Sequence, residues 1–600
     1  TMNLQNIHGK LNRLLAGGDL EAEYKPSPRL RFYAHVSSFS NRFWYGNVPY
    51  NNNDPRNGYF TAEFSLKHPG YYKDASIINT GGSPYLGKLL DLDDSTGHGD
   101  NYRNIQPQYS YAVAPDSFEF KRLFTEINNT FERNPIVAQL DGSYAITDRI
   151  KISAGAKFYW KYGERNISYH EWQFDKSTQT GAQQYLMTNL NLEPVNPNGG
   201  YLPEYGDPYS KILMPFLTRP QLTAMVSQFA NRWFEYTMNE ENVEYWLWVG
   251  SSYKYHEYTS SGYIMADATL FGCLNLTGGL RIENNSMYVT GDTLDTQPTI
   301  DYTTGYVYYK KQSRTIKNNT LAFLPSLNLT WNIKDNQNLR FAVSRTYHRQ
   351  NFSEVKPGAA VINYSDFEFT FGNPNLKPTY SVNLDIAYEY FWGNKGMFEI
   401  GSYYKYITDH IFATTQADAD PTTGIIYKSF QNAGKSWVWG VEAMFKRRFD
   451  FLPKFLSGFG VDANITYSLS RMQVPGRYKQ QPLAEQTPLL YNVALFYEKY
   501  GVSARVALNY TGPFLKALNL AAVTGIGLVH KDDSYDVFMS ENYSLDAQVA
   551  YSFKKHFMVY IELNNLVDSP YKEYRGDPNR PVRVEYYRQR GQIGFKYTLD

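Results

Sequence analysis

Three features are scarce or missing in this sequence of 600 residues, and each excludes a class of protein. Cys273 is the only cysteine, which excludes a disulfide framework and any metal cluster built from cysteine thiolates. No run of 18 or more apolar residues occurs, so the chain has no helical membrane span. A charge excess is missing as well, because 59 Lys and Arg against 58 Asp and Glu leave a net charge of +1. This balance excludes electrostatic binding to nucleic acid, and we expect no nucleic-acid partner.

Aromatic residues are what the chain has in excess: 54 Tyr, 36 Phe and 10 Trp, or 17% of the residues. The hydrophobic fraction is nevertheless only 42%, and the mean hydropathy is −0.51. Tyr is a residue of interfaces and membrane belts more than of dry cores, and a chain so rich in aromatics can bury enough surface to fold. The composition therefore favours a large all-β protein, either soluble or inserted in an outer membrane as a barrel.

Strict alternation of apolar and polar residues indicates how the strands are built. Around Leu384–Trp392, one face carries Leu384, Ile386, Tyr388, Tyr390 and Trp392, and the other carries Asn383, Asp385, Ala387 and Glu389. The same period of two marks the segments Ile150–Trp160, Val461–Leu469, Val502–Tyr510 and Phe557–Leu563. Roughly 9–11 residues is the length with which a tilted strand crosses a bilayer, and a polar opposite face suits a wet lumen. A soluble sandwich also alternates, with its polar face outward, so this alternative stays open.

Connections between the expected strands fall into two lengths. Short turns are predicted around residues 25–28, at Thr147–Arg149 and at Phe553–His556. Long connections are predicted roughly at Gly46–Asp116, Tyr162–Glu244 and Gln473–Glu485. Short turns on one rim and long loops on the other are typical of the periplasmic and extracellular ends of an outer-membrane barrel. About 27 residues per strand and connection accommodate about twenty-two strands, although fewer strands with longer loops fit the same length.

Five stretches, in order along the second half of the chain, carry a resemblance to a known family. Phe371–Ser381 contains Gly-Asn-Pro-Asn-Leu-Lys-Pro and resembles the "GNPxLKPE" junction of TonB-dependent outer-membrane transporters, with Thr379 in place of Glu. Leu339–Phe352 is similar to the strand and loop before that junction, with Gln350 where the family has Pro. Three further stretches match family landmarks: Tyr263–Glu283, Asn432–Glu442 and Leu563–Tyr571. Each stretch alone is a weak signal, but five in the family's order form a strong one.

The resemblance implies the fold and the location of the protein. We expect an all-β fold in which residues 1–600 form one domain, a large antiparallel transmembrane β-barrel of about 22 strands in the outer membrane of a Gram-negative bacterium. Family members also carry an N-terminal plug domain and a TonB-binding segment, and neither is visible in this sequence. We therefore expect the plug to precede Thr1 in a longer protein, and the first barrel strand could be lost with it.

Parity along the alternating strands assigns eight charged residues to the lumen wall: Lys151, Lys157, Asp385, Glu389, Asp462, Arg505, Glu562 and Lys596. They would line a substrate path or hold the plug through salt bridges; the alternative is the ordinary polarity of a lumen wall.

His35 and His348 face the polar side, but no two histidines stand at metal-ligand spacing on one strand. The sequence also shows no nucleophile paired with a base and no phosphate-binding glycine loop. We therefore predict no enzyme activity, no cofactor and no metal site.

The leading hypothesis that the resemblance implies is active import, in which a ligand binds at the outer loops and plug and energised TonB pulls on the plug. A second hypothesis is a family-derived barrel that serves as a structural or partner-binding subunit of an outer-membrane assembly, without transport. A third is a passive pore. The expected partners are outer-membrane lipid and lipopolysaccharide, the TonB complex through the plug, and a surface lipoprotein lid or other assembly subunits. The near-zero net charge indicates neither an anionic nor a cationic ligand.

Overall fold

A computed structural model of the chain shows long β-strands joined by connections that carry shorter elements. The described residues are 3–8, 11–45, 59–66, 118–174, 233–236, 251–294, 299–300, 307–308, 311–357, 359–363, 368–415, 426–475, 477–518, 522–523, 528–529, 533–534, 536–553, 556–585 and 587–598. No helix within these ranges has the length and apolar character needed to cross a membrane.

Most strands belong to one sheet of 20 strands. Its long strands, in chain order, are β2 (Leu11–Ser27), β3 (Leu30–Tyr45), β5 (Phe118–Thr147), β6 (Ile150–Phe174), β8 (Tyr253–Leu270), β9 (Leu274–Leu294), β12 (Lys311–Lys334), β13 (Gln337–His348), β16 (Thr379–Phe391), β17 (Gly396–Thr408), β20 (Ser436–Arg448), β21 (Phe459–Met472), β22 (Leu489–Lys499), β23 (Val502–Thr511), β28 (Asn542–Phe553), β29 (Phe557–Asn564) and β32 (Arg590–Tyr597). Three shorter strands complete it: β1 (Asn3–His8), β4 (Tyr59–Leu66) and β7 (Trp233–Tyr236).

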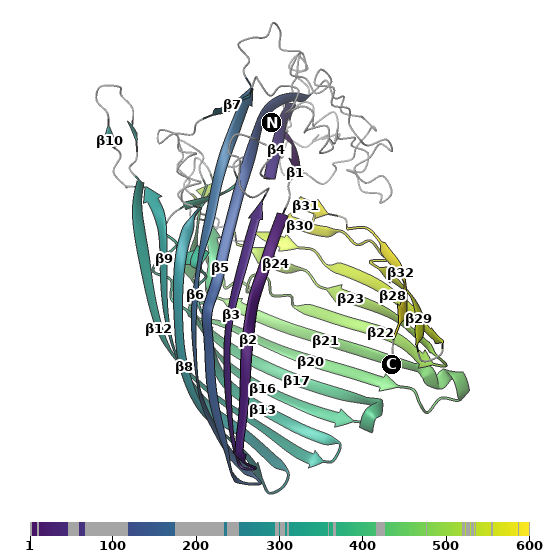
Figure 1. Ribbon diagram of the computed structural model, residues 1–600. Helices are drawn as coiled ribbons and strands as arrows, with labels where there is room; N and C mark the ends of the chain where they lie inside the picture. Colours follow the sequence, from purple (N-terminus) through teal and green to yellow (C-terminus); the bar gives the residue numbers. More distant parts are fainter. Residues whose placement is uncertain are drawn as a thin grey trace.

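The long strands pair in the order in which they follow along the chain, and every pairing is antiparallel, so the sheet is a meander that curves into an open trough (Figure 1). Among the long strands of the described sheet, β2 pairs only with β3 and β32 only with β29, so these two are its edge strands. The short strands β1 and β7 also have one partner each. The predicted all-β, antiparallel architecture is confirmed. Because the two edge strands do not meet, the described sheet is not a closed barrel, and it has 20 strands where about twenty-two were predicted.

The two rims of the sheet differ in the length of their connections. On one rim, only two or three residues separate β2 from β3, β5 from β6, β8 from β9, β12 from β13, β22 from β23 and β28 from β29. Between β22 and β23, Tyr500 and Gly501 have φ angles of 55° and 79°, the left-handed pair that a two-residue hairpin turn requires. The connections on the opposite rim are much longer. The predicted contrast in connection length is confirmed.

One predicted loop is partly wrong. The loop expected at Tyr162–Glu244 begins with strand instead, because β6 continues to Phe174 and β7 pairs with its end. Within the loop expected at Gly46–Asp116, β4 pairs with both β1 and β5. The 30 residues of β5 and the 25 of β6 are about two and a half to three times the number that a strand needs to cross a bilayer. The wall therefore extends beyond a membrane of ordinary thickness on the long-connection rim.

Other long connections fold into small sheets of their own. One contains β14 (Ala359–Asn363), β15 (Glu368–Phe371), β19 (Ile426–Asn432) and β18 (Ile411–Thr415); a second contains β24 (Phe514–Ala517), β27 (Val537–Met539), β30 (Tyr571–Arg575) and β31 (Pro581–Glu585). Two hairpins pair β10 (Thr299–Ile300) with β11 (Val307–Tyr308) and β25 (Ala522–Val523) with β26 (Leu528–Val529). The short helix α4 (Phe352–Val355) lies between β13 and β14.

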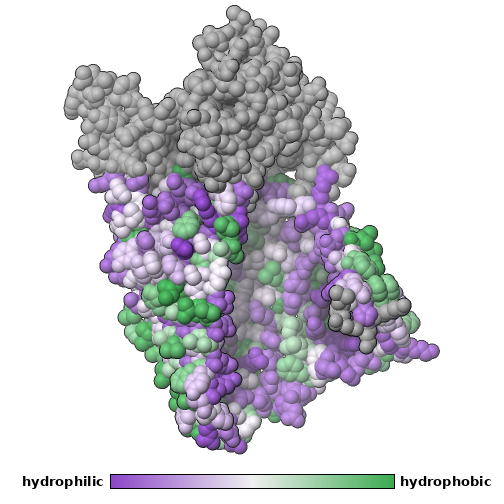
Figure 2. Space-filling view, viewed as in Figure 1, coloured by the Kyte–Doolittle hydropathy of each residue, from purple (hydrophilic) through white to green (hydrophobic). Residues whose placement is uncertain are grey.

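Burial along the strands is the reverse of that in a soluble sheet. In β8, the polar residues Glu257, Thr259 and Ser261 are buried, whereas His256 and Tyr258, which alternate with them, are exposed. Large apolar side chains are exposed on the same outward side of many strands, for example Ile386 at 50% and Ile593 at 78%. Figure 2 shows hydrophobic patches along the outer surface of the wall. An apolar outside and a polar inside suit a barrel wall in lipid and disfavour the soluble sandwich.

The orientation expected for an outer-membrane barrel can be tested with single cysteines. In a Cys273→Ser background, Asp335→Cys places a thiol in the short turn between β12 and β13, and Lys479→Cys places one in the long connection between β21 and β22; both native side chains are exposed. A bulky polyethylene-glycol maleimide cannot cross the outer membrane of intact cells. We expect it to label only Lys479→Cys in intact cells and both variants after detergent lysis. Labelling of Asp335→Cys in intact cells would reverse the assigned orientation.

Candidate functional site on the inner face of the sheet

Cross-strand register places the eight charged residues predicted for the lumen wall on one face of the main sheet. Residues that pair directly across a ladder point to the same side. One unbroken row runs from β6 to β21: Lys151, Asp267, Thr277, Asn328, Ala342, Asp385, Tyr403, Gly440 and Ser468. Another runs from β13 to β28: Asn338, Glu389, Glu399, Met444, Asn464, Asn492, Asn509 and Ser544.

The remaining five residues follow from the same registers. By alternation within their strands and the pairing of those strands, they share the face of Lys151: Lys157, Asp462, Arg505, Glu562 and Lys596. We call this side of the sheet the inner face. That these residues line a lumen stays a prediction, since the described sheet is open.

The structure gives several of these eight residues a charged or polar partner. Lys151 Nζ lies 3.0 Å from Asp267 Oδ2, and Arg505 Nη2 lies 3.5 Å from Asp462 Oδ2. Glu389 is only 4% exposed and pairs with Arg340 at 3.0 Å. Glu562 accepts hydrogen bonds from two glutamines, Gln548 at 3.1 Å and the closer Gln592. Lys157, Asp385 and Lys596 lie on the inner face outside these pairs.

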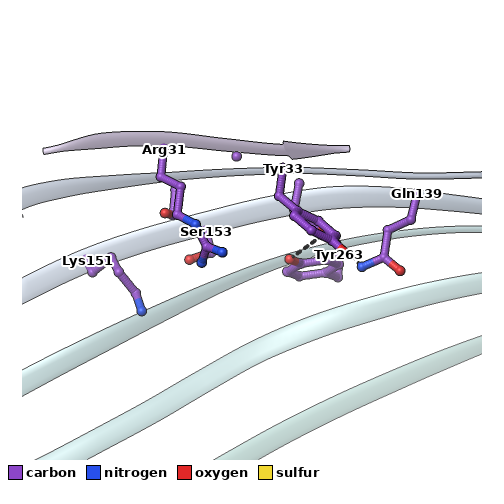
Figure 3. A pocket seen from close by; sticks show the side chains of 9 residues that line it. Arg31, Tyr33, Gln139, Lys151, Ser153 and Tyr263 are labelled. Atoms are coloured by element: carbon purple, nitrogen blue, oxygen red, sulfur yellow. Dashed lines mark hydrogen bonds between the residues drawn. The ribbon is translucent and has the colours of Figure 1, made fainter. Parts of the chain in front are cut away.

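A pocket of about 270 Å³ lies on the inner face near the short-turn rim (Figure 3). It is lined by Arg31, Tyr33, Gln139, Asp141, Gly142, Ser143, Lys151, Ser153 and Tyr263. Tyr263 Oη donates a hydrogen bond of 2.7 Å to Asp141 Oδ1, and Gln139 Nε2 donates one of 2.7 Å to Asp141 Oδ2. Arg31 is paired with Glu23, and Lys151 with Asp267. The two cations thus have acidic partners, and the Asp141 carboxylate is held by a hydroxyl and an amide group.

Tyrosines on the inner face reach their partners by crossing glycines. Tyr263 on β8 lies over Gly155 on β6 to reach Asp141 on β5, and a Cβ on Gly155 would stand 2.2 Å from Asp141 Oδ1 and 2.6 Å from the Tyr263 ring. Such aromatic side chains shield the backbone that a glycine leaves bare. Tyr255 repeats the arrangement over Gly163, and its hydroxyl donates a hydrogen bond of 2.8 Å to Glu132.

Arg349 is the centre of the densest polar cluster on this face. It follows β13, yet its Nη1 lies 2.7 Å from Glu257 Oε1 on β8, 2.5 Å from Tyr159 Oη on β6 and 3.1 Å from Thr259 Oγ1. Asn285 Nδ2 donates a hydrogen bond of 2.9 Å to Glu257 Oε1, so the carboxylate is held from two sides. The chain after β13 therefore turns inward, and Arg349 reaches the inner face of β8 and β6.

Tyr347, two residues before Arg349, also forms a hydrogen bond to a carboxylate on the inner face. The β12–β13 ladder ends at Ser326 and Ser344, next to Pro325, which has no N–H to continue it. Tyr347 Oη donates a hydrogen bond of 2.5 Å to Glu283 on β9, which also pairs with Arg281 at 2.8 Å.

Residues 349–357 and 371–378, which we call the inner segment, cover an apolar part of the inner face. Phe352 stacks on Tyr255 with ring centroids 3.8 Å apart. Val355 and Leu376 pack with Met287 and Val289 of β9, and all four are buried. Burial beside these groups lowers the pKa of the Lys356 amine to about 7, and the nearby Arg165 guanidinium adds to the effect. The inner segment is thus seated on the wall by packing as well as by the Arg349 ion pair.

Side-chain amides fix the far end of the inner segment. Asn432 Oδ1 accepts a hydrogen bond of 2.9 Å from the Lys377 N–H, and Asn432 Nδ2 donates one of 2.9 Å to the Lys377 carbonyl oxygen. The same amide donates to the Asp409 carbonyl oxygen at 2.7 Å. Gln350 Nε2 donates to the Leu376 carbonyl oxygen and so joins the two parts of the segment. Hydrogen bonds therefore connect three of the motif stretches directly: Leu339–Phe352, Phe371–Ser381 and Asn432–Glu442.

The inner face combines paired charges, tyrosine hydroxyls and amides, and such groups bind and orient polar ligands. The one group of three metal-type ligands found among the described residues is Asp19, Glu21 and His35. Parity did not predict Arg349, Glu257 or Tyr159 as a cluster. The signal that could have identified Arg349 was its place in the motif stretch Leu339–Phe352.

Comparisons with known proteins agree with this architecture. The sequence matches the family model described as TonB dependent receptor-like, beta-barrel, over residues 34–566. A similar solved structure is the siderophore receptor PiuA from Acinetobacter baumannii, with 10% identity, 98% of this chain and 64% of that chain covered, and a TM-score of 0.51. Another is the ferric-catecholate import receptor Fiu from E. coli K12, with 11% identity, coverage of 95% and 65%, and a TM-score of 0.48.

The FrpB iron transporter from Neisseria meningitidis has 11% identity, coverage of 98% of this chain and 73% of that chain, and a TM-score of 0.43. At 10% identity, the similarity to PiuA concerns the fold alone. The chain spans less than two thirds of the length of PiuA and of Fiu. No curated protein sequence matches this chain at a significant level.

Replacing Gly155 tests the tyrosine crossing. In Gly155→Ala the added methyl group displaces Tyr263 or Asp141, and we expect a loss of about 1–3 kcal/mol in the free energy of unfolding from overpacking. The matched control is Gly262→Ala on β8, where a Cβ would meet its nearest atom at 3.7 Å. Urea unfolding of the purified protein in detergent, followed by tryptophan fluorescence, measures both. Equal losses in the two variants would contradict the crossing.

Replacing Arg349 tests the buried cluster. Arg349→Met keeps the length of the side chain but leaves Glu257, whose side chain is 8% exposed, without its cation. We expect a loss of about 3 kcal/mol, the cost of breaking a largely buried ion pair. Lys151→Met is the control, because its pair with Asp267 is 51% and 31% exposed and such pairs contribute under about 1 kcal/mol. If the same urea titration gave equal losses, the Arg349 cluster would not hold the inner segment.

Proposed function

Because this chain belongs to the TonB dependent receptor-like β-barrel family, we propose that it forms the barrel of an outer-membrane transporter that imports a ligand with energy from TonB. In this proposal residues 1–600 are one barrel domain, closed to about 22 strands in the complete protein. A plug encoded upstream of Thr1 fills the lumen and contacts the TonB complex, while the outer face contacts lipid and lipopolysaccharide.

The observation that carries the proposal is the polar and partly buried inner face opposite an apolar, exposed outer face. The eight predicted residues share that inner face, and the pairs Lys151–Asp267 and Asp462–Arg505 keep its charges balanced. A wall with balanced charge attracts a ligand of either sign only weakly. In this proposal the outer loops and the plug therefore determine which ligand is bound. We propose that the eight residues line the path of the ligand and the contact surface of the plug.

The second candidate is a barrel without transport that serves as a subunit of an outer-membrane assembly. The two small four-stranded sheets favour this candidate. They give the long-connection rim a folded surface to which a partner protein could bind. In one of them, Lys516 pairs with Glu573, and Arg583 pairs with Glu585. A surface lipoprotein lid or another assembly subunit could dock there. The third candidate, a passive pore, requires an open lumen in the complete protein.

Conductance separates the pore from the other two candidates. We expect the full-length gene product, purified and inserted into planar bilayers in KCl, to show no steady conductance, because a plug fills the lumen of a TonB-dependent transporter. A stable open current would identify a pore and contradict import.

Binding to the periplasmic domain of TonB separates import from a scaffold. We expect the full-length protein, immobilised in detergent, to retain this domain. If the channel is closed, TonB does not bind and other outer-membrane proteins co-purify in fixed ratio, the chain is an assembly subunit and not an importer.

A further inference from the structure

The first pair of long strands brings three metal-type ligands together. In the β2–β3 ladder Glu21 pairs directly with His35, and Asp19 pairs with Ser37, the next residue of β3 on the same face. Asp19 and Glu21 are two residues apart on one strand, so both point to the side of the sheet that His35 occupies. Ligand atoms of the three side chains lie within 4.8 Å of one another. At this separation, side-chain rotations could bring all three ligand atoms onto a single ion.

This group lies on the inner face. Tyr33 pairs with Asp141 in the β3–β5 ladder, and Asp141 lines the pocket with Lys151. His35 follows Tyr33 by two residues and therefore shares its face. The three ligands are beside the pocket, farther from the short-turn rim, and they face the interior of the trough.

Asp19 and Glu21 lack the cationic partner that several other acids of the wall have. Several other acids on the inner face have cationic partners: Glu23 pairs with Arg31, Glu132 with Lys161, Glu257 with Arg349 and Asp267 with Lys151. Asp141 is held instead by hydrogen bonds from Tyr263 and Gln139. Within the described part of the chain, Asp19 and Glu21 form no ion pair with a basic side chain; Glu21 is hydrogen-bonded to Tyr33. Two carboxylates therefore lie side by side next to an imidazole, and the three side chains offer oxygen and nitrogen ligands at one place.

We propose that Asp19, Glu21 and His35 form a binding site for one divalent transition-metal ion of the Zn²⁺ type on the inner face. Zn²⁺ takes carboxylate oxygen and imidazole nitrogen ligands, and it binds with three protein ligands where a fourth position stays open to water or a ligand. Ca²⁺ and Mg²⁺ are disfavoured, because they require oxygen ligands in larger number. The ion would supply the charge that no basic residue supplies here. The site does not depend on the proposed import function.

The spacing of these three residues along the sequence does not indicate a metal site. Metal sites on one strand are recognised by ligands two residues apart, but here the third ligand comes from the neighbouring strand after the turn. Only the register, which brings residue 21 opposite residue 35, reveals it. The sequence-based prediction of no metal site therefore rested on a search within single strands.

The experiment is a titration of the full-length, chelator-treated protein in detergent with Zn²⁺ alone, followed by calorimetry, in the presence of excess Mg²⁺. Co²⁺ serves as a second probe, because its visible absorption reports a nitrogen- and oxygen-ligated site. The variants are His35→Ala and Glu21→Gln. The matched control is His256→Ala, which removes an exposed histidine from the outer side of β8. Cooperative unfolding in urea shows that each variant is folded.

We expect one Zn²⁺ site per chain, unaffected by Mg²⁺ and by His256→Ala, and weakened about tenfold or more by His35→Ala and by Glu21→Gln in folded protein. The Co²⁺ absorption should disappear in the same two variants. Zn²⁺ binding of equal affinity in His35→Ala would overturn the proposal, and so would the absence of any binding to the native protein. Equal weakening by His256→Ala would show adventitious binding to surface histidines and would overturn it as well.

Discussion

The antiparallel backbone ladder is the constraint on which the rest of this structure depends. A strand in hydrocarbon must pair every N–H and C=O group with a neighbour, and pairing fixes the register. Register in turn fixes the face of each side chain, since a slip by one residue would move Lys151 to the lipid side and Ile152 to the interior. The row from Lys151 to Ser468 crosses the wall without a shift, so one polar face continues over most of the sheet.

This polar face explains part of the tyrosine excess. Tyrosine in a barrel is expected at the interfacial girdles and toward lipid, yet Tyr255, Tyr263 and Tyr347 all face inward and donate hydrogen bonds to carboxylates. A phenol is long enough to cross a glycine and reach the strand beyond, which a serine or threonine cannot do. Tyrosine thus links strands that share no backbone bond, and glycines such as Gly155 provide the room.

Local patterns predicted the local features of the fold. Alternation identified the strands around Leu384 and Val502, and turn residues identified the short rim, because period and turn chemistry depend on neighbours in sequence. The Arg349 cluster could not be predicted in this way, since its partners Glu257 and Tyr159 lie 92 and 190 residues away along the chain. The overrun of β6 beyond Tyr162 was missed for a similar reason: those residues are strand because β5 and β8 pair with them, and their own alternation is weak.

The inner segment shows why a barrel wall of this kind cannot be uniformly polar. Met287 and Val289 are apolar residues on the inner face of β9, and water there would be costly without a cover. Val355 and Leu376 provide that cover. Apolar packing is not directional, however, so it does not fix the position of the segment along the strands. Arg349 fixes its start to Glu257, and Asn432 fixes its end at Lys377. The directional bonds therefore determine where the segment sits, and burial of the apolar patch determines that it sits there at all.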